Sequence, residues 1–414
     1  MGPGGDSDHP GGDAGAVPEV PPAEKPAGIR RLRRLRRAPL AGIDDEVAAD
    51  ATEDGSNTPN PHPDAATGPS RLRLLWRRRR PWIIVGLALI LVVALAIPVA
   101  RVWMAWNRIE RIGFDPDSAR EALATAPPTT LPDGPDVEIV DVPGFIPLVP
   151  PSPPIEGQGH TALLIIGSDE GGQRADVIML ALMEEGADLT LVSLPRDLYL
   201  DNPCWNRRER INTALHGCGD VSGPDLLAIV VEDFTGVPVD HFVLFDFDGF
   251  ARVIDAAGGV EVCVDHYTHD RKTDPPLALL AGCNRLNGEM ALSWVRSRYT
   301  RQVVNGVDRR VAGVNDLTRN ERQRDIVLQM LARLSDFPNP SALVRIVEAI
   351  PDAFTLDDGI TLRRAAGLAW KLRGFPRDKV ATPTIPVIFH ATADGAQVLL
   401  PAESFAETMG WATD

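Results

Sequence analysis

The sequence predicts an α/β domain that follows a single membrane-spanning helix. Short apolar runs of strand length recur in the second half of the chain, beginning with TALLIIG at 161–167. Segments with helical spacing of apolar residues alternate with them, such as GPDLLAIVVEDFTG at 223–236. Upstream of both, the run from Pro81 to Ala100 contains no ionisable side chain. The alternation predicts the fold class, and the uninterrupted run predicts the membrane helix.

Composition narrows the class of protein. The chain has 414 residues, 44% of them hydrophobic and 24% charged, so it is long enough for a sizeable core. Four cysteines are too few for a small disulfide-stapled scaffold. The formal net charge of −15 argues against general nucleic-acid binding, which needs a basic surface, so we expect no nucleic-acid partner.

The N-terminal third contains the first two parts of the chain. Residues 1–80 are rich in Gly, Pro, Ala, Asp and Arg without an apolar period, which predicts a disordered tail. As a helix, the run from Pro81 to Ala100 would span ~30 Å, the thickness of a bilayer core. We therefore assign 81–106 to a transmembrane helix and its interface. A cleavable signal peptide is the main alternative, and the long segment before the run argues against it.

Flanking cations indicate the orientation of this helix. Arginines cluster before the apolar run and are sparser after it; they are Arg71, Arg73 and Arg77 to Arg80 before, and Arg101, Arg108 and Arg111 after. The positive-inside rule places the N-terminus in the cytoplasm and the later residues outside the cell membrane. Residues 107–158 include PLVPPSPP, which predicts a Pro-rich extracytoplasmic linker to a domain at 159–414.

The expected elements of that domain follow in order. Strands are expected where apolar runs are bounded by Gly, Pro or Asp, at 161–167, 177–183, 189–194, 241–246 and 259–264. Helices are expected where apolar residues recur at helical spacing, at 223–236, 247–259, 287–295, 316–334, 341–350 and 361–371. Asn287 and Asp316 are expected to cap two of these helices. A short apolar pair near 385–400 completes the domain.

All the cysteines, namely Cys204, Cys218, Cys263 and Cys283, fall in the part that we place outside the cytoplasm. None forms a CxxC motif, and their intervals do not match a zinc site. Two disulfides are therefore expected in an oxidising compartment, with free buried cysteines as the alternative. Of the three possible connectivities we favour Cys204–Cys218 and Cys263–Cys283, because each would close one loop.

Arginines and aspartates recur where the expected strands and helices begin or end. They lie in four segments: GSDEGGQRAD after the first strand, LPRD after the third, WVRSR at the end of one helix and DLTRNERQ at the start of the next. The candidate site residues are Asp169, Arg174, Asp176, Arg196, Asp197, Arg296, Arg298, Arg319 and Gln323. Arg174 and Asp176 stand two residues apart in a strand, so we expect them to project to one face.

Arg319 and Gln323 indicate why this set points to anion chemistry. They stand at i and i+4 on the helix face that continues into Ile326, Met330 and Leu334, so they are expected to point inward. An inward arginine is costly unless it meets an anion, and guanidinium groups match phosphate oxygens in pairs. Aspartates beside them would hold Mg²⁺, which prefers oxygen ligands. Any single pair is also explained by a surface salt bridge, so spacing alone indicates only an anion or phosphoryl site.

Several segments follow one another over about 160–335: LLIIGSD, RADVIML, LTLVSLPRD, RINTALHGCG, VDHFVLFDFDGFARVIDAAGGVEV, LNGEMALSWVRSR and DLTRNERQ. In this order they resemble the LytR-CpsA-Psr family of bacterial envelope proteins, which usually carry one N-terminal membrane anchor. The resemblance implies a single extracytoplasmic α-β-α domain with a central mixed sheet. It also implies binding of polyprenyl-pyrophosphate-linked glycans.

The resemblance implies roles for the candidate residues as well. Asp169 and Asp176 match the family's aspartates linked to Mg²⁺ (or Mn²⁺). Its pyrophosphate-contacting arginines are matched by Arg174, Arg196, Arg296, Arg298 and Arg319, and the glutamine of its last motif by Gln323. Arg210 stands where the family often has lysine, so the charge is kept but the geometry changes. Val177 and Leu198 replace residues that are commonly polar, which puts the polar contacts there in question.

The implied activity is transfer of a glycopolymer phosphate from the polyprenyl-pyrophosphate carrier to a peptidoglycan hydroxyl. Mg²⁺ and the arginines would stabilise the developing negative charge, and Asp176 or Asp197 would accept the hydroxyl proton. A pyrophosphatase for the same carrier and a non-catalytic envelope protein that binds glycan are the alternatives. An arginine-, alanine- and proline-rich chain indicates a high-GC bacterium, so arabinogalactan is a plausible polymer, with teichoic-acid-like or capsular chains as alternatives.

His266, His269 and Asp270 form a second candidate, a metal cluster. We interpret that segment as a solvated loop, because it lacks a helix or strand that would fix the ligands. Ser168 lacks the second glycine of a hydrolase nucleophile elbow, and the sequence contains no Walker loop or dinucleotide fingerprint.

Overall fold

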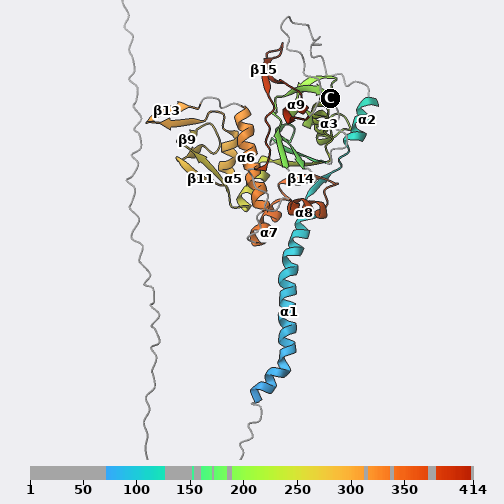
Figure 1. The fold of residues 1–414 in the computed structure, drawn as a ribbon, viewed down its shortest axis with the longest axis vertical. Helices are drawn as coiled ribbons and strands as arrows, with labels where there is room; N and C mark the ends of the chain where they lie inside the picture. Colours follow the sequence, from blue (N-terminus) through green and yellow to red (C-terminus); the bar gives the residue numbers. More distant parts are fainter. Residues whose placement is uncertain are drawn as a thin grey trace, which may run out of the picture. The chain divides into compact units, whose positions relative to one another are not determined.

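The computed structural model describes residues 71–125, 152, 160–169, 172–183, 189–311, 316–335, 340–371 and 379–411. Helix α1 spans Arg71–Trp106 and contains the predicted apolar run (Figure 1). Its segment Ile84–Trp106 is long and apolar enough to cross a membrane. Most of the large apolar side chains of this segment are exposed, as contact with lipid would require. The tail predicted over 1–80 lies outside the described residues up to residue 70. Residues 71–80 belong to α1, so the prediction of a disordered tail is wrong for them.

Six strands form a central sheet in the order β1-β14-β7-β2-β3-β4. Their bounds are Glu110–Ile112 (β1), Phe354–Asp357 (β14), His241–Asp246 (β7), Thr161–Ser168 (β2), Ala175–Met183 (β3) and Leu189–Ser193 (β4). β2 is parallel to β7 and antiparallel to β3, and β1 is parallel to β14, so the sheet is mixed. The predicted strands form its centre, which confirms an α/β fold with a central mixed sheet.

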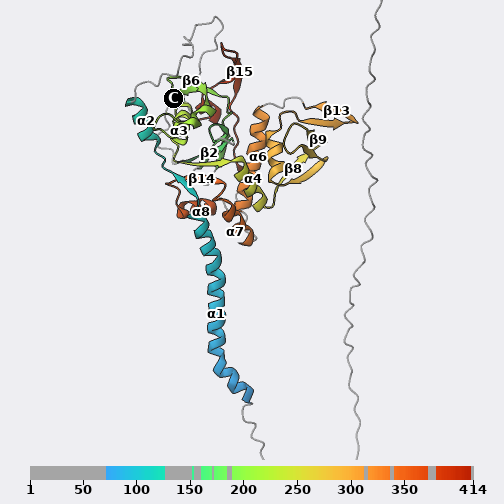
Figure 2. The same ribbon diagram turned by 180° about the vertical axis from the view of Figure 1, so that it is seen from behind.

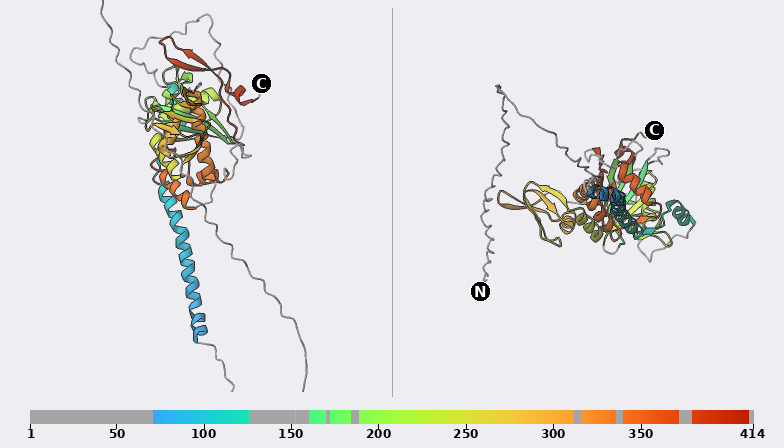
Figure 3. Two further views of the ribbon diagram at one scale, coloured as in Figure 1. Left: turned by 90° about the vertical axis from the view of Figure 1, so that its left-hand side faces the viewer. Right: turned by 90° about the horizontal axis from the view of Figure 1, so that it is seen from below.

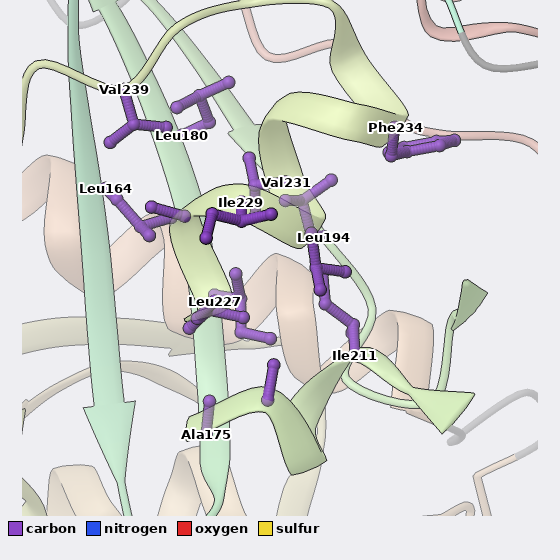
Figure 4. Close-up of a cluster of buried hydrophobic side chains, with 14 of the residues drawn as sticks. Leu164, Ala175, Leu180, Leu194, Ile211, Leu227, Ile229, Val231, Phe234 and Val239 are labelled. Atoms are coloured by element: carbon purple, nitrogen blue, oxygen red, sulfur yellow. The ribbon is translucent and has the colours of Figure 1, made fainter. Parts of the chain in front are cut away.

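Helices cover both faces of this sheet (Figure 2). On one face, Leu164 and Leu180 pack in an apolar cluster with α3 (Gly223–Thr235) and the 3-10 helix η1 (Ile211–His216), as Figure 4 shows. On the other face, Val177 and Met179 pack with residues of α4 (Phe247–Ala256), α5 (Gly288–Arg296) and α6 (Asp316–Ser335). Successive β3 residues therefore enter opposite clusters, and the domain has three layers.

A glycine ends α3, and an asparagine cap begins α5 close to the backbone of α4. Gly236 ends α3 in the left-handed conformation, at φ 71°. The Asn287 side chain accepts the backbone N–H of Met290 and caps α5, as predicted. Gly288 follows that cap, and a Cβ there would lie 2.2 Å from the carbonyl oxygen of Ala251 in α4. The glycine therefore lets α5 begin directly against α4.

A second, smaller sheet has the order β10-β9-β12-β13 and lies beside α5 and α6 (Figures 1 and 3). Its strands are Tyr267–Asp270 (β9), Leu277–Leu279 (β10), Arg301–Val304 (β12) and Val307–Arg310 (β13). The expected solvated loop at His266, His269 and Asp270 is therefore wrong for His269 and Asp270, whereas His266 is exposed in a bend. β9 contains His269 and Asp270, and both are buried because the strand pairs with β10 and β12.

Both cysteine pairs are bonded as favoured, Cys204 to Cys218 and Cys263 to Cys283. The second pair links β8 (Val260–Val264) to β11 (Gly282–Leu286). The first closes a loop that includes β6 (Arg207–Arg210), the partner of β5 (Tyr199–Asn202). The apolar pair near 385–400 is the hairpin of β15 (Val387–Ala391) and β16 (Gln397–Pro401), and α9 (Phe405–Met409) follows it.

The linker expected at 107–158 differs from the structure at its start. Glu110–Ile112 is strand β1 of the central sheet, and Pro116–Thr125 is helix α2, which packs on α3. The Pro-rich segments that predicted a linker come after these residues. β1 and α2 are short, and they are ordered because β1 pairs with β14 and α2 packs on α3. Residues 126–151 and 153–159 lie outside the described residues. Helices α7 (Pro340–Ala349) and α8 (Leu362–Lys371) match the helices predicted near the C-terminus.

Candidate functional site

Two of the four candidate segments, GSDEGGQRAD and LPRD, meet at one edge of the central sheet. β2 and β7 run parallel and end together, with Ser168 paired to Asp246. β3 runs antiparallel to both β2 and β4, so its first residues lie at the edge where those strands end. Asp169 follows β2, Asp176 lies at the start of β3, and Arg196 follows β4. The topology therefore gathers residues that are far apart in the sequence.

Asp176 lies at an irregularity in the β2–β3 pairing. Gly167 pairs with Val177, but the next residue, Ser168, pairs with Ala175. Asp176 is thus an extra residue on β3, which is a β-bulge. Bulges redirect side chains and are common beside active sites. Here the bulge leaves Asp176 partly exposed at the strand edge while its neighbour Ala175 is buried.

Four charged side chains form one chain of contacts at this edge. Arg196 Nη1 lies 2.5 Å from Asp176 Oδ1, and Arg196 Nε lies 3.5 Å from Asp197 Oδ2. Asp197 Oδ1 in turn lies 3.3 Å from Arg210 Nε. The four side chains keep between 19% and 37% of their surface exposed, so a ligand can still reach them. We call Asp176, Arg196, Asp197 and Arg210 the edge cluster.

The backbone beneath the edge cluster is rigidly held. The N–H of Ile211 donates to the carbonyl of Leu198 at 2.7 Å, and the N–H of Asn212 donates to that of Arg196 at 3.2 Å. These bonds bring Arg210 beside Asp197. Ala175, Leu194 and Ile211, which flank the cluster in sequence, are buried in the apolar cluster on the α3 face (Figure 4). The charged side chains therefore project from buried supports.

Asp169 and Arg174 lie in the turn between β2 and β3. The Asp169 carboxylate accepts the N–H groups of Gln173 at 3.2 Å and Arg174 at 3.4 Å, through Oδ1. The N–H of Asp169 donates to the carbonyl of Arg174 at 3.2 Å. The Arg174 side chain itself is exposed. The structure thus joins these two residues through the backbone and leaves the guanidinium in solvent.

Arg296 reaches the same edge from α5. Its guanidinium carbon lies 4.3 Å from the centre of the Phe247 ring, and Phe247 directly follows Asp246 at the end of β7. Cations over aromatic faces are stabilised by the ring quadrupole. Arg298 lies two residues beyond Arg296 and is exposed. Arg296 is therefore tied to the edge by a contact, whereas for Arg298 the structure shows only exposure.

Arg319 and Gln323 face inward on α6, as the sequence predicted. Their exposed fractions are 5% and 6%, and Ile326 and Met330 on the same helix face are buried as well. Helix α6 contacts β4, the strand that leads to Arg196. These two residues thus lie on the helix that packs beside the edge cluster. The Leu334 side chain, predicted on the same face, lies outside the described residues.

A buried polar network holds the segment between Arg296 and Arg298, and sequence reasoning missed it. Ser297, between the two arginines, donates through Oγ to Asp270 Oδ2 at 2.7 Å. Arg322 donates to the carbonyl of Trp294 at 3.1 Å and to Thr300 Oγ1 at 3.2 Å, and its guanidinium lies 3.9 Å from the centre of the Trp294 ring. The network therefore fixes the backbone on both sides of Ser297.

Burial changes the ionisation of this network. Burial lowers the pKa of Arg322 to about 10, although the nearby Asp270 and Glu321 charges act in the opposite direction. Burial alone would raise the pKa of Asp270. Hydrogen bonds from Ser297 and from the N–H groups of Lys272 and Tyr299 outweigh it and hold the pKa below its ordinary value. Only the place of Arg322 in DLTRNERQ, three residues after Arg319, pointed to this region, and no sequence signal paired Arg322 with Asp270.

The two positions that depart from the family pattern are apolar in their surroundings as well as in their side chains. Val177 packs in the cluster on the α4 face, and Leu198 packs in the cluster on the α3 face. At these two positions the side chains therefore make apolar packing contacts, where the family pattern would provide polar ones. The N–H of Ile211 donates to the carbonyl of Leu198, and the N–H of Leu399 donates to the carbonyl of Asp197, so the backbone here is held in place.

Carboxylates and guanidinium groups at one edge can bind a phosphate together with a divalent cation. Asp169 and Asp176 offer oxygen ligands, which suit a hard cation that also takes phosphate oxygens and water. Among the described residues, three protein ligand groups lie within 4.8 Å of one another only at Glu261, Cys263 and Cys283, and both of those thiols are in a disulfide.

Comparisons with known proteins agree with the architecture. Probable cell wall biosynthesis protein LcpB of Corynebacterium glutamicum is 32% identical over 249 residues, covering 59% of this chain and 54% of that protein. The polyisoprenyl-teichoic acid–peptidoglycan teichoic acid transferase TagV of Bacillus subtilis is 28% identical over 220 residues, covering 52% of each chain. This chain thus spans about half the length of these curated relatives.

Solved structures share the fold. A LytR-Csp2A-Psr enzyme from Actinomyces oris matches with a TM-score of 0.51 and 25% identity, covering 64% of this chain and 96% of that one. B. subtilis TagV matches with a TM-score of 0.50 and 23% identity, covering 62% of this chain and all of that one. The sequence model described as the LytR_cpsA_psr family matches residues 144–410. The chain therefore belongs to the LytR_cpsA_psr family.

Proposed function

We propose that this protein is a membrane-anchored transferase that moves a glycopolymer phosphate from a polyprenyl-pyrophosphate carrier to a hydroxyl group of peptidoglycan. The observation that carries the proposal is the edge cluster, in which cationic and anionic side chains from β3, the turn after β4 and β6 form one connected and partly exposed set. Family membership and relatives named as teichoic acid–peptidoglycan transferases support it. In this chain the glycopolymer is a wall polymer of the producing bacterium.

The arginines bind the diphosphate. Arg196 and Arg210 supply guanidinium groups from opposite sides of Asp197, and Arg296 adds a third cation from α5. Arg174, Arg298 and Arg319 complete the proposed set. A diphosphate would compete with the carboxylates for these donors, because guanidinium forks match phosphate oxygens. The protein is acidic overall, so this local concentration of cations is what makes anion binding favourable.

Asp169 and Asp176 would hold Mg²⁺ or Mn²⁺. Their oxygen ligands and their places at the strand edge fit such a cation. The bound cation would neutralise charge on the diphosphate. Asp176 also accepts a hydrogen bond from Arg196, so the protein holds this carboxylate in place independently of the metal.

The transfer needs one proton acceptor. The acceptor hydroxyl oxygen bonds to the phosphorus next to the glycan, the bond to the distal phosphate breaks, and polyprenyl phosphate leaves. The hydroxyl proton passes to Asp176 or Asp197, and the arginines stabilise the charge on the transferring group. The exposure of the cluster leaves room for the acceptor to approach these carboxylates.

Helix α1 would anchor the enzyme in the cell membrane. We place the N-terminus in the cytoplasm, because arginines precede the span more densely than they follow it. The catalytic domain then lies outside, and strand β1 of its central sheet follows shortly after α1. Two disulfides in the domain support this placement, because disulfides persist in oxidising compartments.

Reconstitution tests the proposal. The full chain in lipid nanodiscs would receive a lipid-linked glycan, peptidoglycan and Mg²⁺. Glycan joined to peptidoglycan supports transfer, free glycan phosphate alone indicates a pyrophosphatase, and unchanged substrate indicates binding only. We expect Arg196→Ala to lower transfer by about 10²–10³-fold, the usual cost of removing one charge-stabilising donor. Arg208→Ala is the matched control, because Arg208 pairs with the exposed Asp201. Equal activity of Arg196→Ala and the control would contradict the site.

A further inference from the structure

Helix α8 is amphipathic but has no fully buried residue. Leu362, Ala365, Leu368 and Ala369 are half-buried and form its inner side. The outer side consists of exposed residues and presents Trp370, which is 69% exposed. Three cations share that outer side: Arg363, Arg364 and Lys371. A large exposed aromatic among cations is typical of helices that lie in a membrane interface.

The start of α8 is tied to the end of the candidate membrane span. α1 and the span both end at Trp106. Arg111 lies over the Trp106 ring, with 5.1 Å between the guanidinium carbon and the ring centre, and it donates through Nη1 to the carbonyl of Ile360 at 2.8 Å. Ile360 stands two residues before the first residue of α8. β1 and β14 pair in the same place, with Ile112 opposite Asp357.

Helix α7 and the turn after it attach to the same end of α1. Arg101 Nε lies 2.9 Å from Glu348 Oε1, and Arg108 Nη2 lies 3.5 Å from Asp352 Oδ1. Both contacts join the last turns of α1, or the residues just after it, to the stretch that leads into β14 and α8. In Figures 1 and 2, α7 and α8 lie beside the end of α1. Once α1 spans a bilayer, α8 is held at the height of the headgroups.

We propose that the exposed side of α8 binds anionic phospholipid headgroups on the extracytoplasmic face of the cell membrane. This would be a second membrane contact in addition to α1. Trp370 would enter the interface, and Arg363, Arg364 and Lys371 would meet the headgroup phosphates. The inference rests on the proposed membrane anchor. The contact restricts rotation of the domain about α1. Lipid is favoured over a protein partner because Arg111 ties Ile360, just before α8, to Trp106 at the end of the span.

The test places a single fluorescent label on the full chain in nanodiscs that hold one copy each. The native cysteines are paired in disulfides, so an added thiol is the reactive one. Ala366→Cys reports on the outer side of α8, and Ala393→Cys, which replaces another exposed alanine in the β15–β16 turn, is the matched control. Ala94→Cys reports on the span itself. Quenching is measured with nitroxide lipids, labelled at the headgroup or in the acyl chain.

We expect the Ala366→Cys label to be quenched by headgroup nitroxides at least about two-fold more than the Ala393→Cys label, and the Ala94→Cys label to be quenched by acyl-chain nitroxides. Equal quenching at 366 and 393 with strong quenching at 94 would overturn the α8 contact and leave the anchor standing. Absence of quenching at residue 94 would overturn both the membrane anchor and the α8 contact. The transfer activity is measured in the separate reconstitution assay, so its failure can be told apart from failure of the α8 contact.

A charge-reversal pair tests the lipid chemistry. Arg363→Glu combined with Lys371→Glu should lower headgroup quenching at 366 by about half or more in nanodiscs rich in phosphatidylglycerol. Arg309→Glu combined with Arg310→Glu, on the exposed strand β13, is the matched control and should leave it unchanged. Quenching that stays the same in the α8 variant, or that is equal in purely zwitterionic nanodiscs, would overturn recognition of anionic headgroups.

Discussion

Substituting Asp270 tests whether the buried network supports the arginine segment. The Asp270 carboxylate is 1% exposed and accepts hydrogen bonds from Ser297 Oγ at 2.7 Å and from the N–H groups of Tyr299 and Lys272, both at 2.9 Å. In Asp270→Asn the amide NH₂ must face at least one of these donors. One charge-assisted bond is lost and one buried donor has no acceptor, which together cost about 2–4 kcal/mol.

This cost is large enough to measure by thermal unfolding. For a domain of this size we expect the midpoint of Asp270→Asn to fall by roughly 4–16 °C, measured by differential scanning fluorimetry of the full chain in detergent. Asp308→Asn is the matched control, since Asp308 lies in the same small sheet as Asp270 but pairs with Arg301 at an exposed position. Midpoints of Asp270→Asn and wild type that agree within error would refute the reasoning.

The pH dependence gives a second check on the same residue. The pKa of Asp270 lies below its ordinary value of 3.8, because the hydrogen bonds to the ionised form outweigh burial. A lowered pKa stabilises the fold above the ordinary value, and that stabilisation disappears as the pH falls through the lowered pKa. The difference in midpoint between wild type and Asp270→Asn should therefore narrow below about pH 4. A difference that stays constant would show that the charge of Asp270 does not stabilise the fold.

Three further outcomes follow from the structure. Removing divalent cations with EDTA should abolish transfer and added Mg²⁺ should restore it, whereas activity in EDTA would exclude the proposed cation. Cys204→Ala with Cys218→Ala opens a loop with a separation of 14 residues that carries Arg210, so denaturant unfolding should show a loss of about 3 kcal/mol, and unchanged stability would contradict this. Gly288→Ala should destabilise the fold by about 1–3 kcal/mol, because its Cβ would overlap Ala251, and an equally stable variant would contradict that packing.

The central sheet could be predicted because its strands are long apolar runs with clear boundaries. β2, β3, β4 and β7 each begin or end within about two residues of the expected positions. The charged residues of the site could be predicted for a related reason, since polar side chains directly after buried strands have few structural uses. The edge cluster confirms that Asp176, Arg196 and Asp197 come together. Bulge formation at Asp176 was not predictable, because it depends on the register with β2.

The small sheet was missed because its strands are short and polar. β12 and β13 have only intermediate or exposed side chains, so they show no apolar run. Their turn did carry a signal: Asn305 and Gly306 have positive φ values of 52° and 77°, and an Asn-Gly pair between Val residues is a strong hairpin indicator. The Asp270 and Arg322 network had no comparable signal, since its members come from three elements that only the folded chain brings together.

Under the two proposals above, the arginines of the edge cluster would bind the diphosphate and the cations of α8 would bind the membrane surface. An acidic protein at an anionic membrane repels a diphosphate carrier unless cations are concentrated locally. The cluster arginines are mostly shielded and paired with carboxylates, so salt screens them weakly, whereas the α8 cations are exposed and screened within about 8–10 Å. Raised ionic strength should therefore weaken the α8 contact before it weakens diphosphate binding, which separates the contribution of membrane docking from that of the site.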